Sequence, residues 1–389
     1  DLFDTDYNQS IKHFERALEL DPTYSLPYFW ILGHYMNGNR FDEVEAIIGR
    51  LRDKRDQLSL LYRHQLDAVI AQLEGNIDKV AYHILEARNL DRNSRVLNFL
   101  VLFWAPYANR PGEAIKLWNE TKGEPKLLAD VLPGRYRQAF TLVARAHHML
   151  GEYRQGLKVI RQGDKYYPDS FHIDEARAMA ALGKIEKVKS IIEKSHALSS
   201  RDIDPGGIMF SAAKELREHG HLSAYKEIAN QAVDWYEDRL LEDATNLMRL
   251  NVAEALYVAE RWDEAQLLFE ELAKEFLDIG SWQGYRGNPP DIITCQGYLA
   301  TLAARKGDRE KALQISEELK NLDHPYLFGR HTQWRARIAS LLGEREEAFS
   351  LLRESLMQGR CYGVALLRDM DFEPLRDYKP FQDLLKPKR

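Results

Sequence analysis

The chain has 389 residues, of which 44% are hydrophobic and 29% are charged. This composition excludes wholesale disorder and a collagen-like repeat, and two cysteines give no disulfide framework. A net charge of −6 argues against general nucleic-acid binding, and no apolar run approaches the roughly 18 residues of a membrane-spanning helix.

One short pattern recurs along the chain and predicts its elements in order. It combines a small or polar residue, a large side chain and two polar residues, and it ends on a residue that opens an amphipathic helix. The clearest copies end at Val44, Val80, Gly156, Val188, Ala265, Ala312 and Ala348, and weaker copies end at Ser10, Ala114 and Tyr225. The copies recur at intervals of roughly 34 residues, with longer steps before Gly156 and Ala312.

Two further positions keep the same register. Twelve residues before the last residue of a copy lies a small or apolar residue, which lets two helices approach closely, as at Ala68, Ala144, Ala176, Ala213, Ala253, Ala300 and Ala336. Four residues after it lies a large apolar residue, as at Ile48, Ile84, Trp118, Ile160 and Phe269. Each helix pair is then amphipathic on two sides, so we expect neighbouring pairs to stack and bury one continuous core.

On these residues the chain resembles the tetratricopeptide repeat (TPR) family over nearly its whole length. The resemblance implies an all-α fold, an α-solenoid wound as a right-handed superhelix of about ten helix-turn-helix repeats. We expect one elongated array over residues 1–360 rather than separate domains. A TPR array is commonly a binding platform, which directs attention to its concave face.

The array departs from regularity in three places. The first repeat is incomplete, because only six residues precede its second helix. We therefore expect either that the array, or an effector domain, precedes this chain in a longer parent, or that this helix acts as a cap. Insertions near 122–134 and 278–291 contain glycine and proline, and the second, with three glycines and two prolines within residues 280–290, is not expected to be helical. The second insertion carries a predicted contact set of Trp282, Tyr285 and Arg286, although these side chains would also suit a turn that folds back on the array.

Residues 361–389 are expected to cap the last apolar face. The run Asp371-Phe372-Glu373-Pro374-Leu375 and the following Pro380-Phe381 resemble the ends of C-terminal TPR arrays in bacterial signalling and transcriptional regulators. This resemblance implies a bacterial, cytoplasmic protein in which the array is the sensor or interaction region of a regulator.

In TPR arrays the first helix of each pair lines the concave face. Carried over by position, this rule assigns aromatic residues to the early repeats and basic residues to the middle ones. The predicted ligand-binding set is Phe29, Tyr62, Phe99, Phe103, Arg145, His148, Arg177, Lys214, Arg217 and Tyr257. Such a groove suits an extended peptide with acidic and apolar side chains.

No sequence motif for catalysis, nucleotide binding or metal binding is present. The adjacent His147 and His148 point in different directions on a helix, and His219 and His221 lie in a turn, so we expect no metal or other cofactor. We also expect no catalytic residues, because the repeats take up nearly the whole chain. The leading hypothesis is a non-enzymatic scaffold for a protein or peptide. The alternatives are a sensor of a small anionic effector and a structural subunit of a permanent assembly.

Overall fold

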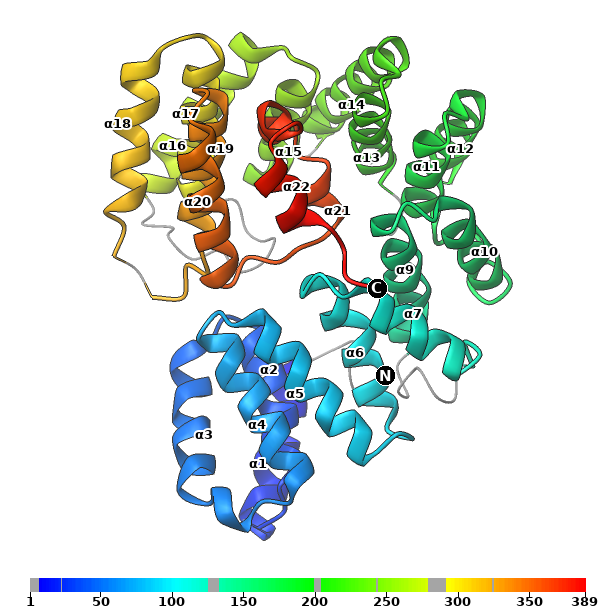
Figure 1. Ribbon diagram of the computed structural model, residues 1–389, viewed down its shortest axis with the longest axis vertical. Helices are drawn as coiled ribbons and strands as arrows, with labels where there is room; N and C mark the ends of the chain where they lie inside the picture. Colours follow the sequence, from blue (N-terminus) through cyan, green and yellow to red (C-terminus); the bar gives the residue numbers. More distant parts are fainter. Residues whose placement is uncertain are drawn as a thin grey trace.

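The computed structural model describes residues 7–21, 23–124, 133–198, 204–242, 244–278, 292–323 and 325–389. Within these residues every regular element is a helix, and the helices follow one another as antiparallel pairs (Figure 1). The all-α, solenoid-type fold expected from the repeats is therefore confirmed.

The early and middle elements are α1 (Tyr7–Leu20), α2 (Leu26–Asn37), α3 (Phe41–Asp53), η1 (Arg55–Gln57), α4 (Leu60–Leu73), α5 (Ile77–Leu90), α6 (Arg95–Tyr107), α7 (Pro111–Glu120), α9 (Pro133–Met149), α10 (Tyr153–Gly163), α11 (His172–Ala181), α12 (Ile185–Ala197), α13 (Pro205–Glu218) and α14 (Leu222–Glu242). The late elements are α15 (Asn246–Val258), α16 (Trp262–Asp278), α17 (Ile292–Arg305), α18 (Arg309–Lys320), α19 (Arg330–Leu341), α20 (Arg345–Met357), α21 (Val364–Leu367), η2 (Met370–Leu375) and α22 (Lys379–Leu385).

The recurring sequence pattern is the turn inside each helix pair. From α2–α3 to α19–α20, every such turn contains one residue with a left-handed backbone. In most pairs this residue is glycine, which adopts positive φ without a steric penalty. The residues are Asn39, Gly75, Asn109, Gly151, Gly183, Gly220, Glu260, Gly307 and Gly343. The second helix of the pair then starts two residues later, which explains why the pattern ends inside it.

The expected close approach of the paired helices is also present. The small residue predicted on the first helix is fully buried at Ala176, Ala213, Ala253, Ala300 and Ala336. The large residue predicted on the second helix is buried as well, as at Ile48 and Phe269. Stacked pairs thereby share apolar surface, which drives the folding of a repeat array.

The array is not elongated as expected, because its late repeats return to its early ones (Figure 1). The ring of Phe41, at the start of α3, stacks on the ring of Tyr326 at 4.3 Å and lies 5.8 Å from that of Phe328. Both partners belong to the connection between α18 and α19. The array therefore closes on itself, and its inner face is enclosed by the early and late repeats.

The C-terminal segment, residues 361–389, occupies part of the space inside the closed array. Its η2 packs on α19, its α22 on α20 and its α21 on α9. At its end the amide of Lys388 donates to the carbonyl oxygen of Asn109 at 2.9 Å, and the Asn109 side chain donates to the carbonyl oxygen of Lys386 at 3.0 Å. The segment thus covers the last repeat. It also crosses the space inside the closed array and reaches the turn between α6 and α7.

The closure can be tested at Gly75, where an added Cβ atom would lie 2.3 Å from the carbonyl oxygen of Gln358. Gly151 has nearly the same φ, but nothing lies within 4 Å of its Cβ position. Alanine at either site costs about 1–2 kcal/mol for the left-handed backbone. We expect only Gly75→Ala to push the late repeats away and raise the radius of gyration in small-angle X-ray scattering. Equal radii for the two variants would contradict the closed arrangement.

Candidate ligand-binding site on the inner face

The inner face binds the acidic part of the C-terminal segment through arginines from three repeats. Arg337 on α19 pairs with Asp369 at 2.7 Å. Arg305 on α17 pairs with Asp371 at 2.6 Å, and Arg217 on α13 pairs with Glu373 at 2.5 Å. These charge-assisted contacts hold residues 369–373 as a ligand would be held.

Tyr257 on α15 belongs to the same set of contacts. Its hydroxyl donates to Asp371 at 2.5 Å and accepts from Arg305 at 2.9 Å, and the side chain is buried. Burial and the neighbouring Asp371 raise the pKa of Tyr257 well above its ordinary value, so its hydroxyl remains a proton donor.

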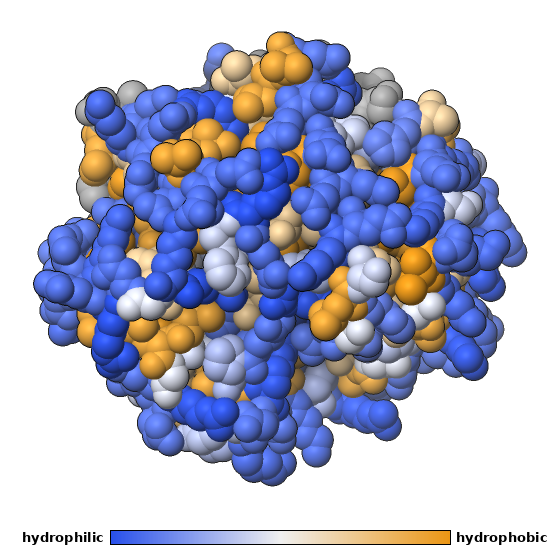
Figure 2. Space-filling model, turned by 90° about the horizontal axis from the view of Figure 1, so that it is seen from above, coloured by the Kyte–Doolittle hydropathy of each residue, from blue (hydrophilic) through white to orange (hydrophobic). Residues whose placement is uncertain are grey.

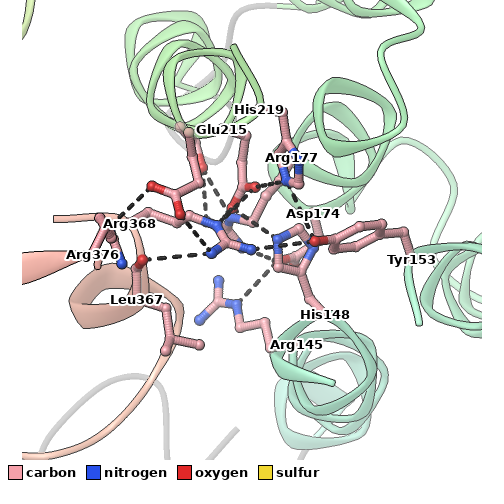
Figure 3. Close-up of polar contacts among 12 residues, drawn as sticks. Arg145, His148, Tyr153, Asp174, Arg177, Glu215, His219, Leu367, Arg368 and Arg376 are labelled. Carbon is pink, nitrogen blue, oxygen red and sulfur yellow. Dashed lines mark hydrogen bonds and ion pairs between the residues drawn. The ribbon is translucent and has the colours of Figure 1, made fainter. Parts of the chain in front are cut away.

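The opposite arrangement of charges holds the preceding part of the segment (Figure 3). Here the array supplies the carboxylate: the Glu215 side chain, only 1% exposed, accepts from the Arg368 Nε atom at 3.1 Å. Glu215 also contacts the Nε2 atom of His148 at 2.8 Å and that of His219 at 3.5 Å. One buried carboxylate therefore connects α9, α13 and the C-terminal segment.

Electrostatics favour an ionised Glu215 beside a neutral His148. Burial opposes ionisation of Glu215, but hydrogen bonds from His148 and His219 and the charge of Arg368 lower its pKa well below the ordinary range. Burial lowers the pKa of His148, so this imidazole is neutral and its Nε2–H donates to Glu215.

A second buried carboxylate, Asp174 on α11, lies between two arginines. It accepts from Arg145 of α9 at 3.0 Å and from Arg177 at 2.7 Å. Burial alone would raise the pKa of Asp174, but the two guanidinium groups lower it below its ordinary value. Arg177 also donates two hydrogen bonds to the hydroxyl oxygen of Ser211. The Arg145 side chain, by contrast, is 41% exposed.

Arg145 faces a cavity of about 390 Å³ whose lining includes no residue of the C-terminal segment, although Tyr362 of that segment donates to the carbonyl oxygen of Tyr107 at the cavity's edge. The cavity opens between the first helices of successive pairs, α6, α9, α11 and α13. Its walls combine aromatic, cationic and anionic groups: Phe103, Tyr107, Arg137, Gln138, Thr141, Leu142, Arg145, Asp169, Ser170, Phe171, His172, Ile173, Asp174, Asp204 and Ile208. A volume of this size accommodates one or two side chains of a peptide or a small ligand.

The predicted aromatic end of the groove divides into exposed and buried parts. Phe29 on α2 stacks on Tyr62 of α4, with ring centroids 5.2 Å apart and 9° between the planes. Both rings are half-buried, so they retain surface for a partner. Phe99 is buried in a core cluster that includes residues from α4 to α10, and Phe103 reaches the cavity.

The structure thus separates the predicted site residues into groups. Phe103 and Arg145 line the cavity, and Phe29 and Tyr62 form a stacked pair elsewhere. His148, Arg177, Arg217 and Tyr257 contact other groups of the chain, and the Lys214 ammonium lies 4.1 Å from the centre of the Phe210 ring. Trp282, Tyr285 and Arg286 lie outside the described residues.

Sequence reasoning did not find the acidic partners Asp174 and Glu215 or the roles of Arg368 and Asp371. Glu215 stands in the run Lys214-Glu215-Leu216-Arg217-Glu218 on α13, and a charged run of this kind usually marks an exposed helix face. Nothing in the sequence indicates that its partner is 153 positions away.

No family model matches the chain, and no curated protein matches it. Several solved structures are similar to it at low identity. The Naa15/Naa10 complex bound to HypK-THB is 15% identical with a TM-score of 0.30, over 90% of this chain and 56% of that chain. Yeast Tom70 is 12% identical with a TM-score of 0.36, over 89% and 80%. The P58(IPK) TPR domain is 13% identical with a TM-score of 0.22, over 90% and 95%. At these values the likeness carries no conclusion about function.

Proposed function

We propose that the chain is a non-enzymatic scaffold that binds a protein partner through an extended segment with acidic and apolar side chains. The supporting observation is the chain's own segment 369–373, whose carboxylates pair with arginines of the inner face while Phe372 is buried. A face that holds one such peptide has the chemistry to hold another wherever it is not already covered.

The cavity beside Arg145 is the uncovered part of that face to which we assign the partner. Among the described residues, Arg145 uses only its Nε atom, on Asp174, so its terminal amino groups are available to a carboxylate. Phe103 and Tyr107 supply an apolar wall. We therefore expect an acidic residue next to an aromatic or aliphatic one in the bound segment.

A small anionic effector is the second candidate, because the cavity volume falls within the range of small-ligand sites. The lining makes it the weaker one. Asp169 and Asp204 stand in the same wall as Arg137 and Arg145 and would repel a multiply charged anion. A peptide brings amide donors as well as a carboxylate, and these donors complement such a mixed wall.

A structural subunit would need a large continuous apolar surface. On the described part of the face in Figure 2, apolar side chains form separate spots among hydrophilic ones, so this face offers no such surface. None of the helices in the described ranges is long and apolar enough to cross a membrane.

The regulator-like C-terminal run supports a further proposal, that the scaffold is the interaction region of a bacterial cytoplasmic regulator.

The proposal is tested by selecting binding peptides from a random phage-displayed library on the immobilised chain. We expect the enriched sequences to combine acidic and apolar residues. A synthetic copy of one of them should bind Arg145→Glu at least tenfold more weakly, a loss of about 1.4 kcal/mol, in fluorescence polarisation.

Arg137→Glu is a second variant, since Arg137 lines the same cavity without holding Asp174. Arg154→Glu is the matched control, because Arg154 is exposed on α10, the second helix of the same pair. Unchanged affinity in both cavity variants would refute this site. Displacement of the peptide by inorganic phosphate or a nucleotide would favour the small anionic effector.

A further inference from the structure

Two histidines and an aspartate meet between the helices of one early pair. His64 and Asp67 lie one turn apart on α4, and His83 lies opposite them on α5. The Nδ1 atoms of the two histidines are 3.1 Å apart. One ligand atom from each of the three residues lies within 4.8 Å of the other two, and all three side chains are half-buried.

This spacing matches the ligands of a tetrahedral metal ion. Zinc binds imidazole nitrogen at about 2.0–2.1 Å, which places two such ligands about 3.3 Å apart. Two imidazoles and one carboxylate exclude a calcium or magnesium site, because these ions require oxygen ligands. Three protein ligands leave one coordination position for water or for a group from a partner.

The two histidines already face each other without a metal, since their Nδ1 atoms are 3.1 Å apart. The alternative explanation is a simple hydrogen bond between two neutral histidines, which the experiment below distinguishes.

Arg55 of η1 competes for the carboxylate. It forms a two-pronged ion pair with Asp67, with contacts of 2.6 and 2.8 Å to the two oxygen atoms. A metal ion would have to share Asp67 with this guanidinium group or displace it, which lowers metal affinity by like-charge repulsion. Removing the charge of Arg55 should therefore raise the affinity for the metal ion.

We propose that His64, Asp67 and His83 form a binding site for a divalent transition metal ion of the zinc class, which joins α4 to α5 and leaves one coordination position open. The site is independent of the cavity at Arg145, so its failure would leave the proposed function untouched. Cu²⁺ should bind more tightly than Zn²⁺, following the general order of affinities.

The test is titration of the chelator-treated chain with Zn²⁺ in competition with a chromophoric chelator. We expect one equivalent of Zn²⁺ per chain, with affinity at least tenfold weaker in His64→Gln and in His83→Gln. Asp67→Asn should also bind more weakly, whereas Arg55→Gln should bind several-fold more tightly. The matched control is His196→Gln, since His196 is an exposed histidine on α12 outside the cluster.

Circular dichroism of the metal-free variants checks that each remains folded. With Co²⁺ in place of Zn²⁺, the visible absorption should be that of a four- or five-coordinate ion, and it should be lost in both histidine variants. Binding that is absent, or that the His64 and His83 substitutions leave unchanged, would overturn the proposal and leave the histidine pair as a hydrogen bond.

Discussion

Replacing Glu215 by glutamine should lower the free energy of unfolding by about 3–5 kcal/mol. The carboxylate is nearly inaccessible and is shared by Arg368, His148 and His219. Glutamine keeps the shape but removes the charge, so the guanidinium of Arg368, itself 14% exposed, loses its main counter-charge. An uncompensated buried charge is costly, which is why breaking such a pair destabilises a protein more than forming it stabilises one.

Urea unfolding followed by circular dichroism measures this effect. The control is Glu19→Gln, because Glu19 pairs with Arg16 on α1 with both side chains more than 60% exposed. Surface pairs contribute about 0–1 kcal/mol, so the control should be close to wild type. Similar losses in the two variants would show that the Glu215 cluster does not connect the C-terminal segment to the array.

The difference between wild type and Glu215→Gln should also depend on pH. The folded pKa of Glu215 lies well below its value of 4.5 in the unfolded chain. A lowered pKa contributes stability that is complete above the unfolded value and is lost as the pH falls toward the folded one. The difference should therefore be constant between about pH 7 and pH 5.5 and shrink as the pH falls through 4.5. A difference that grows on acidification would contradict the assignment.

Replacing Phe372 by alanine should cost about 3–5 kcal/mol and should also loosen the C-terminal segment. The Phe372 side chain is fully buried among Leu375, Phe381 and the apolar face of α20. Its neighbours Asp371 and Glu373 are held by Arg305 and Arg217. The cavity left by the ring therefore weakens the packing that positions both ion pairs.

Hydrogen exchange followed by mass spectrometry locates the effect. We expect faster exchange in residues 369–389, with the pairs from α2 to α11 less affected, because each repeat packs mainly on its neighbours. Met357→Ala is the control, since Met357 is 71% exposed on α20 and its loss should leave stability within about 0.5 kcal/mol. Uniform loss of protection along the chain would instead show that the segment is needed for the whole array.

The local structure of the repeats could be predicted from the sequence because it depends on short-range constraints. A residue suited to left-handed backbone, such as Gly151 or Gly343, must close each turn, and a small residue such as Ala213 must stand where two helices touch. These requirements recur with the repeat and are visible in one chain. The predicted ligand-binding set on the inner face used the same register. Two of its members, Arg145 and Phe103, line one cavity.

The closure of the array could not be predicted in this way. Its curvature is the sum of small rotations between successive pairs, and no single residue records that sum. Whether Phe41 meets Tyr326 is therefore decided only when the whole array has formed. The same holds for Arg217 and Glu373, which the sequence presents as one exposed base and one exposed acid, 156 positions apart.

The amino-acid sequence accordingly decided the helix pairs, their turns and their stacking, because each depends on residues within one repeat length. The tertiary structure decided which inner-face residues remain available to a partner. His148, Arg177, Arg217 and Tyr257 are used by the chain itself, whereas Arg145 keeps donors toward a cavity. The physical reason is that a buried polar group requires a partner. The partners of Arg217 and Tyr257 come from the far end of the chain, and those of His148 and Arg177 come from the array itself.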